Sequence, residues 1–533
     1  MKSKLPIFFI LILGFILRII FINQLPPSPN WDEVSHGFNA YSILKTGHDE
    51  WGTFMPLIFR CFGDFKLPLY IYLTVISVFL FGLNTFSVRL VSILAGTLTI
   101  FFIYLILKKI LLYPSGRRAK NNLIPIISGF IVCLSPGSIF LSRIALEANL
   151  FMCLFLISFY FLLSKKYGLS SFIYGISLFT YNSSRVLLPF YLTCLIYLLI
   201  KSKVKPLKEY LKFIPFVLLS LLALAQTLNQ SGQARYQWVS ILDSGSINQI
   251  NELRATYPRI LVNKVTYFTF SAVKNYLSHF NPQFLFINGG SNYQFNIPNF
   301  YLISPLFLPF LILGLIYLFK TIKNDYSKII LFFFLISPIP SAITRDAPHI
   351  LRSIVFIPFS IITISLGFSY FVKKFKKLSL IYFSIALITT QILFWPKYFT
   401  YAKQYSASWQ YGYSQVVSYI KTNYNSYDQI IFTKKYGEPH EFILFYWPWN
   451  SDNYQHDTSK NWDYHANWYW INAFNKFVFI NDWEIKGYTQ NLPLDKKILL
   501  VSSPNNYNQT NTNLLQTINF LDGSPAFEIL EIK

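Results

Sequence analysis

The stretch VRLVSILAGTLTIFFIYLIL, residues 88–107, is an uninterrupted apolar run and decides the class of fold. As a helix it is long enough to cross the hydrocarbon core of a bilayer, which is roughly 30 Å thick. Apolar runs of similar length recur through the first 395 residues. Hydrophobic residues make up 53% of the chain and charged residues only 13%, against about 25% charged in an average soluble protein. This composition excludes a soluble, disordered or fibrous protein and predicts a multi-spanning membrane protein.

The net charge of +23 is concentrated in short loops between the apolar runs. Short basic loops of this kind mark the cytoplasmic side of a membrane protein. We therefore interpret the charge as a signal of orientation, and nucleic acid is not an expected partner. The basic clusters are Lys2 and Lys4; Lys108, Lys109, Arg117, Arg118 and Lys120; Lys165 and Lys166; Lys201, Lys203, Lys205, Lys208 and Lys212; Lys320, Lys323 and Lys328; Lys373, Lys374, Lys376 and Lys377.

The basic loops also predict the topology. With the amino terminus inside, the first apolar run is a retained helix, because no small-residue cleavage site follows it. The short run 67–81 is expected to lie along the interface or to re-enter, since counting it as a span would place the next basic cluster outside. About eleven transmembrane helices remain, with external loops at 23–87 and 227–299. The predicted spans are 5–22, 88–107, 123–141, 148–164, 169–181, 186–200, 211–227, 300–319, 328–343, 353–372 and 378–395.

The sequence predicts two domains, a membrane module over 1–400 and an extracytoplasmic α/β domain over 401–533. From about Tyr405 onward, Asn, Asp, Tyr and Trp replace the long apolar runs. Short strand-like runs and one helical pattern favour a small α/β fold. The predicted strands are 429–432, 476–480 and 497–501, and the predicted helix is 414–423.

Two aromatic segments of this domain, YWPWN (446–450) and NWYWIN (467–472), have two interpretations. Their rings could stack on the faces of sugars. They could equally pack the domain against the lipid interface, where Trp and Tyr are enriched. The sequence leaves both interpretations open.

Two adjacent carboxylates, Asp32 and Glu33, follow the first apolar run in NWDEVSHGF. An anionic pair at the membrane surface is costly unless it is solvated, bound to a cation or used as a base. The structural alternative is that Asp32 caps the helix that follows. Both carboxylates are candidate catalytic residues.

The segment GDFKLPLYIY (63–72) places Asp64 and Lys66 just ahead of the predicted interfacial run. A lysine ammonium at headgroup depth could bind a lipid phosphate, and Asp64 is a candidate substrate contact. The alternative for Lys66 is a side chain that snorkels to the interface.

Three further predicted external turns carry charge. In LSRIALEANL, Arg143 and Glu147 are four residues apart and would pair on one helical face. In FTYNSSRVLLPF, Arg185 could bind phosphate through two hydrogen bonds, with Tyr181 beside it. We expect the arginines of these turns to form an anion site opposite the carboxylates. The third turn, TRDAPHILR, adds Arg345, Asp346, His349 and Arg352.

One histidine of the 227–299 loop, His279, is a candidate general acid or ligand, although a lone histidine more often makes a structural hydrogen bond. No GxGxxG, P-loop, HExxH or GxSxG pattern is present, which disfavours nucleotide and serine-hydrolase chemistry. No cofactor and no metal ligands are assigned, and a divalent cation is left open.

A series of segments follows in order along the chain: WDE, TGHDEWG, GDFKLPLYIY, FGLNTFSVRL, LSPGSIFLSRIALEANL, YNSSRVLLP, HFNPQFLFINGG and PHILR. In this order they resemble the membrane glycosyltransferases of the GT-C fold, in particular bacterial relatives of dolichyl-phosphate-mannose protein mannosyltransferases and of the lipid A aminoarabinose transferase, families 39 and 83. The resemblance covers roughly residues 1–400, and the tail adds no signature. Relatives often carry Trp-His where this chain has Gly137-Ser138, and a polar residue where it has Gly290.

The resemblance implies transfer of a sugar from a polyprenyl-phosphate donor to a protein, lipid or glycan acceptor on the external face, with inversion at the anomeric carbon. It places the catalytic aspartate on Asp32, the donor-phosphate lysine on Lys66 and a second acidic residue on Glu147. The remaining candidates are assigned from their turns: Arg143, Arg185, Arg345 and Arg352 to the donor phosphate, and Asp64, Tyr181, His279 and His349 to the substrate.

Two other classes of function compete with the transferase. A transporter or flippase for a lipid-linked sugar would also need external cations and a lipid groove. Transporters tend to place polar residues and broken helices at the bilayer midplane, often in two repeats. Here the ionisable residues crowd the predicted external rim and no repeat is found. A structural scaffold would not require the clustered arginines, so the sequence favours a transferase in the plasma membrane.

Overall fold

The computed structural model describes residues 5–112, 123–202, 210–490, 496–507 and 512–532. The chain divides into two compact units. The chain passes from the first unit to the second for the last time between Pro396 and Lys397. This point is close to the predicted domain boundary at residue 400. The first unit comprises Met1–Ile20, Ser92–Ser142 and Leu146–Pro396, and the second comprises Phe21–Val91, Arg143–Ala145 and Lys397–Lys533. Several predicted cytoplasmic cations lie outside the described residues: Lys2, Lys4, Arg117, Arg118, Lys120, Lys203, Lys205 and Lys208.

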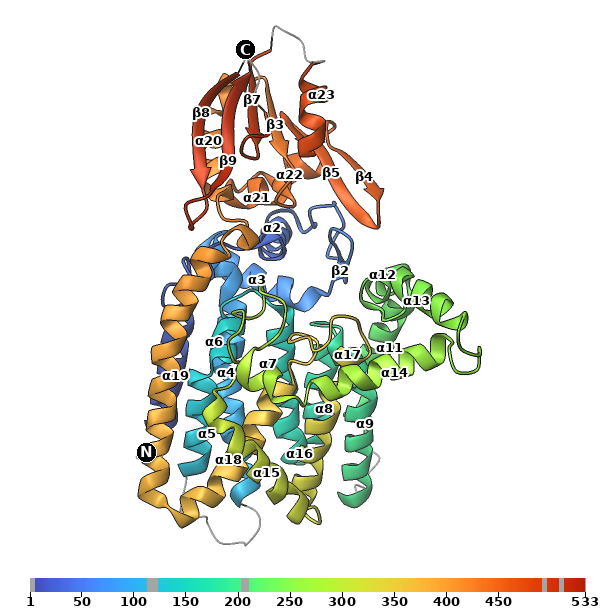
Figure 1. Ribbon diagram of the computed structural model, residues 1–533, viewed down its shortest axis with the longest axis vertical. Helices are drawn as coiled ribbons and strands as arrows, with labels where there is room; N and C mark the ends of the chain where they lie inside the picture. The colour runs from blue at the N-terminus through green and yellow to red at the C-terminus, as the bar shows by residue number, and fades with distance from the viewer. Residues whose placement is uncertain (1–4, 113–122, 203–209, 491–495, 508–511, 533) are drawn as a thin grey trace. The chain divides into compact units, whose positions relative to one another are not determined.

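The first unit is a bundle of helices that run side by side (Figure 1). A helix occupies the position of each predicted span, because each apolar run satisfies its backbone hydrogen bonds internally, as the bilayer interior requires. Helices α4 and α19 continue from this unit into the second. The helices are α1 (Leu5–Ile19), α4 (Thr85–Leu112), α5 (Leu123–Leu134), α6 (Pro136–Ser142), α7 (Glu147–Leu163), α8 (Tyr167–Ser177), α9 (Ser183–Ser202), α11 (Ile214–Leu228), η2 (Pro305–Phe307), α15 (Leu308–Lys320), α16 (Asp325–Ile336), α17 (Ile339–Ala342), α18 (Phe356–Lys374) and α19 (Lys376–Gln404).

Among the described residues, the helices α4, α9, α18 and α19 are each long and apolar enough to cross a membrane alone. Two bent pairs raise the number of spans from 4 to as many as 6: α5 with α6, bent by 58°, and α11 with the helix that follows it, bent by 63°. The other apolar helices are shorter. The chain is therefore a helical, multi-pass membrane protein, as its composition predicts.

Helices α15 and α18 approach each other closely at two glycines. A Cβ atom on Gly314 would lie 1.9 Å from the Thr363 carbonyl oxygen, and a Cβ atom on Gly367 would lie 2.1 Å from the Phe310 carbonyl oxygen. Small residues at such positions let helix backbones come into van der Waals contact inside a membrane. Any larger residue at either position would push the two helices apart.

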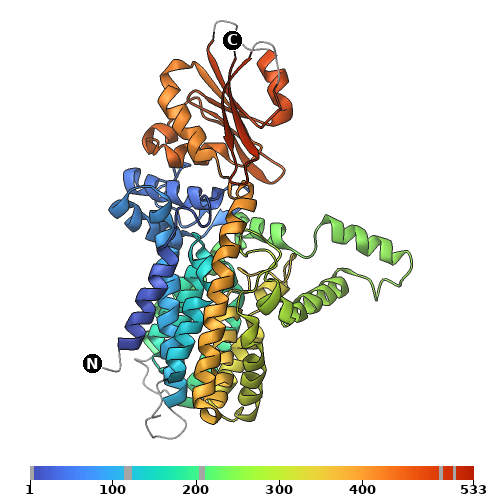
Figure 2. The ribbon, with the colours of Figure 1, turned by 60° about the vertical axis from the view of Figure 1, so that its left-hand side comes forward.

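The loop predicted over 227–299 is largely helical and polar. It contains α12 (Gln230–Val239), α13 (Ser244–Arg254), α14 (Lys264–Ser278) and the π-helical turn η1 (Gln283–Ile287). Asp243 and Asn263 cap α13 and α14 by accepting hydrogen bonds from backbone N–H groups of the first turn. Figures 1 and 2 both show α13 and α14 extending away from the helical bundle of their unit.

The second unit begins with the segment before α4. It contains α2 (Trp31–Thr46), the short antiparallel strands β1 (Phe59–Arg60) and β2 (Phe65–Lys66), and α3 (Pro68–Phe81). Pro68 occupies the first position of α3, where its missing N–H costs nothing, and Gly82 ends the helix. The predicted run 67–81 is thus a helix of 14 residues, and its orientation along the interface remains a prediction.

The carboxyl-terminal part of this unit is an α/β domain, as predicted. Its sheet has 7 strands in the order β4-β5-β6-β3-β7-β9-β8, with β3 parallel to both β6 and β7 and the outer pairs antiparallel. The buried apolar runs predicted as strands form the parallel centre. The strands are β3 (Gln429–Thr433), β4 (Asn461–His465), β5 (Trp468–Phe474), β6 (Phe477–Ile480), β7 (Ile498–Ser502), β8 (Thr512–Asn519) and β9 (Pro525–Ile532). The helices are η3 (Ala407–Trp409), α20 (Tyr413–Asn423), η4 (Tyr424–Ser426), α21 (Pro439–Tyr446), α22 (Ser451–Gln455), η5 (Asp482–Glu484) and α23 (Ile485–Gln490).

Helix α2 packs directly against α21 and α22 of this domain. A Cβ atom on Gly37 would lie 2.6 Å from the Phe445 ring, so the glycine allows the close approach. The Gln455 side-chain amide donates hydrogen bonds to the Ser42 hydroxyl and the Asp49 carbonyl oxygen, both at 2.8 Å. These contacts explain why residues from the two ends of the chain form one compact unit.

Candidate functional site

Asp32 and Lys66 form an ion pair in the second unit. The Lys66 Nζ atom lies 2.9 Å from Asp32 Oδ1 and also donates to the Asp32 backbone carbonyl oxygen at 3.1 Å. The Lys66 side chain is only 10% exposed, whereas the Asp32 side chain is 48% exposed. A largely buried cation therefore holds a carboxylate that solvent can reach.

The helix-cap interpretation of Asp32 is wrong, because Asn30 is the N-cap of α2. The Asn30 side chain accepts a hydrogen bond from the Glu33 N–H at 3.0 Å, and the Glu33 carboxylate accepts one from the Asn30 N–H at 3.2 Å. This reciprocal arrangement is a capping box, and its Asn-x-x-Glu signature is present in the sequence. Asp32 lies in the same first turn, where the helix dipole favours a negative charge.

Glu33 is committed to a buried network around Arg89. Arg89 Nε and Nη2 each donate to a different Glu33 oxygen at 2.9 Å, and the Ala145 N–H donates to Glu33 Oε1 at 2.8 Å. Both charged side chains are at most 1% exposed. Sequence reasoning did not identify Arg89, although an arginine inside an apolar run is itself a signal that a buried partner exists. Its guanidinium also donates to the carbonyl oxygens of Ile22, Pro26 and Ser28.

The prediction that Arg143 and Glu147 lie on one helical face is wrong. Helix α6 ends at Ser142 and α7 begins at Glu147, so no helix contains both residues. Arg143 is fully buried, donates to the Leu25 carbonyl oxygen at 2.9 Å and lies 5.8 Å from the centre of the Tyr398 ring. These contacts hold Arg143 within the second unit, whereas Glu147 belongs to the first.

The segment that carries Lys66 is shaped by the pairing of β1 with β2. Phe59 pairs with Lys66, and Arg60 pairs with Phe65. Asp64 accepts a hydrogen bond from the Phe65 N–H at 2.7 Å and so stabilises the turn before β2. The Lys66 ammonium also lies 5.7 Å from the centre of the Phe62 ring.

Two of the predicted anion-binding arginines share a cavity in the first unit. The cavity has a volume of about 180 Å³, and Arg185, Arg352, Arg235 and Tyr181 contribute to its lining. Sequence reasoning did not identify Arg235. Tyr181 is within electrostatic range of Arg235, Arg352 and Glu147, so an acidic group also belongs to this neighbourhood.

The arginines of this cavity already make contacts within the protein. Arg185 donates to the Gln226 side-chain oxygen at 2.6 Å, and Arg352 donates to the Thr344 hydroxyl at 2.9 Å. The Arg345 guanidinium lies near two acidic side chains, 3.9 Å from Asp243 and 3.6 Å from Asp346. An anion in the cavity would compete with neutral acceptors, which bind a guanidinium less strongly than a charged oxygen does.

Of the two candidate histidines of the first unit, His279 is buried and His349 is partly buried. Burial lowers the pKa of His279 to about 4, and its Nδ1 lies 2.7 Å from the Asn275 carbonyl oxygen. Burial, together with the nearby guanidinium groups of Arg352 and Arg235, holds the pKa of His349 well below its usual range. Neither histidine is protonated near neutral pH, so neither is a ready general acid.

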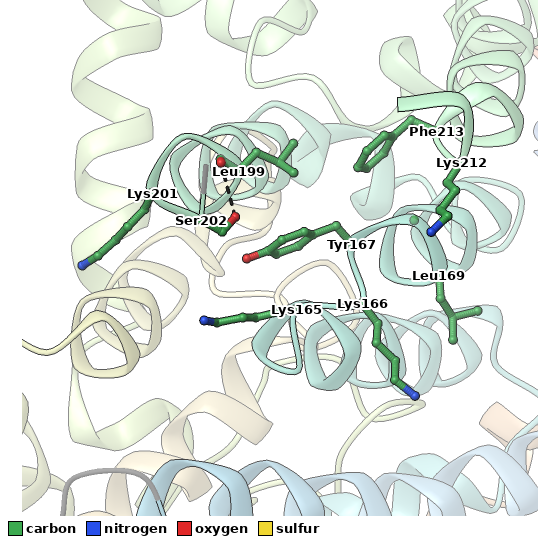
Figure 3. Close-up of a pocket in the computed structure, with 10 residues that line it drawn as sticks. Lys165, Lys166, Tyr167, Leu169, Leu199, Lys201, Ser202, Lys212 and Phe213 are labelled. Atoms are coloured by element: carbon green, nitrogen blue, oxygen red, sulfur yellow. Dashed lines mark hydrogen bonds between the residues drawn. The ribbon is translucent and has the colours of Figure 1, made fainter. Parts of the chain in front are cut away.

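A cavity of about 790 Å³ lies elsewhere in the first unit. Figure 3 shows that Tyr167, Ser202 and four lysines line it. The lysines are Lys165, Lys166, Lys201 and Lys212, all from clusters predicted to be cytoplasmic. Lys201 forms an ion pair with Asp325 at 2.6 Å. None of the candidate catalytic residues lines this cavity, so we separate it from the site around Asp32.

The aromatic segments of the α/β domain pack within their own unit. NWYWIN forms most of β5, where the Trp468 ring stacks on Phe62 with centroids 5.6 Å apart. In YWPWN, the Trp447 and Trp449 rings both pack against Tyr424. Neither the sugar-stacking nor the lipid-interface interpretation accounts for these contacts, which are internal to the second unit.

A second group of titratable side chains is buried in the same unit as Asp32. Glu50 follows α2, while Glu438, His440 and Glu441 lie at the start of α21, and each is at most 4% exposed. Burial raises the pKa of Glu50 and of Glu438 to about 7. Burial and the Glu50 charge raise the pKa of Glu441 well above its usual range. Burial lowers the pKa of His440 to about 3.

Sequence reasoning did not identify this buried cluster. The only signal is the close spacing of histidine and acidic residues in GHDE (47–50) and EPHE (438–441). Neither spacing matches a recognised metal-binding pattern, and the two segments come from opposite ends of the chain. Only the packing of α2 on α21 brings them together.

No family model matches the sequence, and no curated protein matches it. Among solved structures, the chain is similar to ArnT from Cupriavidus metallidurans bound to undecaprenyl phosphate, with a TM-score of 0.52 and 11% identity over 99% of this chain and 98% of that chain. The apo state of the same protein aligns with a TM-score of 0.51 and 11% identity over 99% and 97% of the two chains. An apo oligosaccharyltransferase from Archaeoglobus fulgidus aligns with a TM-score of 0.48 and 11% identity, over 82% of this chain and 63% of that chain. The full-length match to ArnT confirms the GT-C fold expected from the sequence.

Proposed function

Starting from this shared fold, we propose that the chain transfers a sugar from a polyprenyl-phosphate donor to an acceptor hydroxyl on the external face of the membrane. The observation that carries the proposal is the Asp32–Lys66 pair, in which a largely buried ammonium lies 2.9 Å from a solvent-accessible carboxylate. An ArnT structure of the same fold contains undecaprenyl phosphate, which supports this class of donor.

In the proposed reaction Asp32 is the general base. Its carboxylate takes the proton from the acceptor hydroxyl as that oxygen forms a bond to the anomeric carbon. The bond from the anomeric carbon to the phosphate oxygen breaks at the same time, and the lipid phosphate leaves with the electron pair. Attack from the face opposite the leaving group inverts the anomeric carbon. No nucleotide is needed, because the phospholipid is both carrier and leaving group.

Lys66 is the proposed contact of the donor phosphate. In the structure its ammonium is neutralised by Asp32. When a donor phosphate binds, it would share the ammonium and weaken its hold on the Asp32 carboxylate. A less strongly paired carboxylate is a better proton acceptor, so donor binding would prepare the base for the acceptor.

Glu33 has a positioning role in this proposal. Its charge is already satisfied by Arg89 and two backbone N–H groups, so it has little capacity to accept a further proton. Through the capping box, Glu33 fixes the first turn of α2 and therefore the backbone of Asp32. We assign Arg143 to the same positioning function, because it is buried against Leu25 and Tyr398.

The cavity lined by Arg185, Arg352 and Arg235 is the proposed second cationic site. Its guanidinium groups suit a phosphate or another anionic group of the substrates. Tyr181 would contact the same ligand, since it lies within electrostatic range of Arg235 and Arg352. Glu147 lies within range of Tyr181 and would contact a hydroxyl group of the substrates. We propose weaker substrate contacts for Arg345, which is exposed, and for Asp64.

The experiment that tests the proposal offers the purified full-length protein a panel of polyprenyl-phosphate sugars and follows loss of each donor. We expect one donor to be consumed in the presence of an acceptor. Binding of a donor without any turnover, together with its movement across the bilayer of a liposome, would instead identify a flippase.

Replacing Lys66 with methionine should reduce donor turnover roughly 10- to 150-fold, because a charge-assisted contact to phosphate contributes about 1.5–3 kcal/mol. The measurement is kcat/KM for the lipid donor with purified protein. The control is Lys45→Met, which removes an exposed lysine from the last turn of α2. A stable Lys66→Met protein with unchanged kcat/KM would mean that Lys66 only snorkels.

The proposed orientation predicts which surface cysteines react from outside the cell. Cysteines placed at the exposed positions Thr53 and Thr458 should react with an impermeant thiol reagent in intact cells, and one at Lys166 should not. The native cysteines Cys61, Cys133, Cys153 and Cys194 are all buried, so their background reaction should be low. Labelling of the Lys166 variant without labelling of the Thr458 variant would show that the orientation is the opposite of the proposed one.

A further inference from the structure

The buried cluster of Glu50, His440 and Glu441 has the composition of a metal site. One potential ligand atom from each residue lies within 4.8 Å of the other two. Imidazole nitrogen and carboxylate oxygen are both common ligands of Zn²⁺, which catalytic and structural sites bind through three or four protein ligands. All three side chains are at least 96% buried, which is unusual for carboxylates that have no cation beside them.

The hydrogen bonds of the cluster are incomplete among the residues that the structure describes. Glu50 Oε1 accepts a hydrogen bond from the Asn39 amide at 2.9 Å. Glu441 Oε2 and His440 Nδ1 are buried and have no hydrogen-bond partner in the described part of the chain. The nearest acidic atom to His440 Nδ1 is Glu438 Oε2, at 3.5 Å. The Ser35 side chain also hydrogen-bonds to Glu441. The two carboxylates thus face each other, and one Glu441 oxygen has no donor in the described part of the chain.

Lys66 alone does not balance the negative charges of Glu50 and Glu441. It lies within electrostatic range of both Glu50 and Glu441, yet its ammonium forms the 2.9 Å ion pair with Asp32. Lys460 also lies within electrostatic range of Glu50, but it is shared with Asp49 and Asp457. Among the described residues, Glu50 and Glu441 therefore share their cations with other carboxylates. A buried charge left without a full partner is strongly destabilising, so the cluster requires either a shared proton or a further cation.

The space between these residues fits a single ion. Glu50, His440, Glu441 and Cys61 line a cavity of about 10 Å³. About 10–15 Å³ is the minimum volume that holds one water molecule. The cavity is therefore far too small for a sugar or a phosphate, but it suits a metal ion.

We propose that Glu50, His440 and Glu441 bind one divalent cation, with Zn²⁺ as the preferred ion. In a tetrahedral zinc site with bonds of about 2.0–2.1 Å, neighbouring ligand atoms are about 3.3 Å apart. In the structure the three ligand atoms are up to 4.8 Å apart. Binding an ion would shorten each of these distances by about 1.5 Å at most. Side-chain rotation achieves such a movement, because all three groups sit at the ends of rotatable side chains.

The cation would have a structural function that goes beyond the proposed transfer reaction. Glu50 belongs to the turn after α2, and His440 with Glu441 belongs to the first turns of α21. A metal ion bound to both segments would fix α2, whose first turn carries Asp32, to the α/β domain. It would also relieve Lys66 of the Glu50 and Glu441 charges and leave that ammonium for Asp32 and the donor phosphate.

Metal content tests this site independently of transfer activity. The full-length protein is purified in detergent, stripped with a chelator, reloaded with Zn²⁺, Mn²⁺ or Mg²⁺, and passed through a desalting column before elemental analysis. We expect about one Zn²⁺ per chain, less Mn²⁺ and no retained Mg²⁺. Reloading with Zn²⁺ should raise the thermal unfolding temperature by at least about 3 °C, because a ligand that binds only the folded state stabilises it. Less than a tenth of an ion per chain in the wild-type protein would overturn the proposal.

The variants Glu441→Gln and Glu50→Gln keep side-chain volume and remove one charge each. Each should lose the retained Zn²⁺ and the rise in unfolding temperature. The matched control is His465→Asn, which removes an exposed histidine 3.1 Å from Asp463 and should keep both. If instead a shared proton holds the carboxylates, the glutamine variants will be as stable as the wild type and the metal content of every form will be zero. If one variant fails to fold, the other variant and the wild-type metal content still decide the question.

Discussion

Replacing Asp32 with asparagine should reduce sugar transfer at least a hundredfold while donor binding is retained. A positioned general base contributes about 10²–10⁴ in rate, and an amide cannot accept the acceptor's proton. Asparagine keeps the size of the side chain, and the helix cap is unaffected because Asn30 provides it. The measurement is transfer by the purified variant, with donor binding assayed in parallel.

Asp452 provides a matched control for this variant. Asp452 is the second residue of α22, and an asparagine is the N-cap of that helix. Asp32 has the same position in α2, whose N-cap is also an asparagine. The Asp452 side chain is 70% exposed and has no part in the proposed reaction. Asp452→Asn should therefore leave transfer unchanged. Near-normal transfer by Asp32→Asn would remove Asp32 from the mechanism and make Glu33 or Glu147 the next candidate base.

Replacing Glu33 with glutamine should destabilise the protein by about 3–5 kcal/mol, because it leaves the fully buried Arg89 without its counter-charge. Four hydrogen bonds converge on the Glu33 carboxylate, two of them from Arg89. A neutral amide cannot accept all of them, since one of its two terminal atoms is a donor. Thermal unfolding of the purified protein measures the loss.

The control for Glu33 separates the capping box from the buried ion pair. Glu484 completes a capping box with Asn481 but lies on the surface. Glu484→Gln should cost no more than about 1 kcal/mol, as expected for a cap contact alone. If Glu33→Gln unfolds at the wild-type temperature but loses transfer, Glu33 acts on the substrate and its assignment as a positioning residue fails.

The helices of the first unit could be predicted from the sequence because the bilayer leaves few alternatives. A backbone in hydrocarbon must satisfy its hydrogen bonds internally, so a long apolar run becomes a helix whatever surrounds it. The predicted spans 88–107 and 378–395 lie inside the long helices α4 and α19. The span 123–141 is broken between α5 and α6 by 58°, at the Ser135-Pro136 step, because proline removes a backbone donor.

The strands of the α/β domain were only partly predictable. The centre of the sheet, at β3, β6 and β7, consists of short apolar runs, since parallel strands are covered on both faces. The edge strands β4 and β8 have largely exposed residues and few apolar side chains facing a core. Their pairing with β5 and β9 is decided by tertiary contacts, and the composition of the segments does not reveal it.

The sequence by itself determined the membrane class, the basic loops and the local order of the candidate residues, because each depends on residues that are close in the chain. It also contained the capping box of Asn30 with Glu33, which is a local motif. Only the tertiary structure decided which charges are partners: Lys66 reaches Asp32 across 34 residues, and Arg89 reaches Glu33 across 56. The same holds for His440 and Glu50, which meet because α2 packs on α21. A charge in a low-dielectric interior must find its counter-charge wherever the fold brings one within reach, and a one-dimensional pattern does not contain that distance.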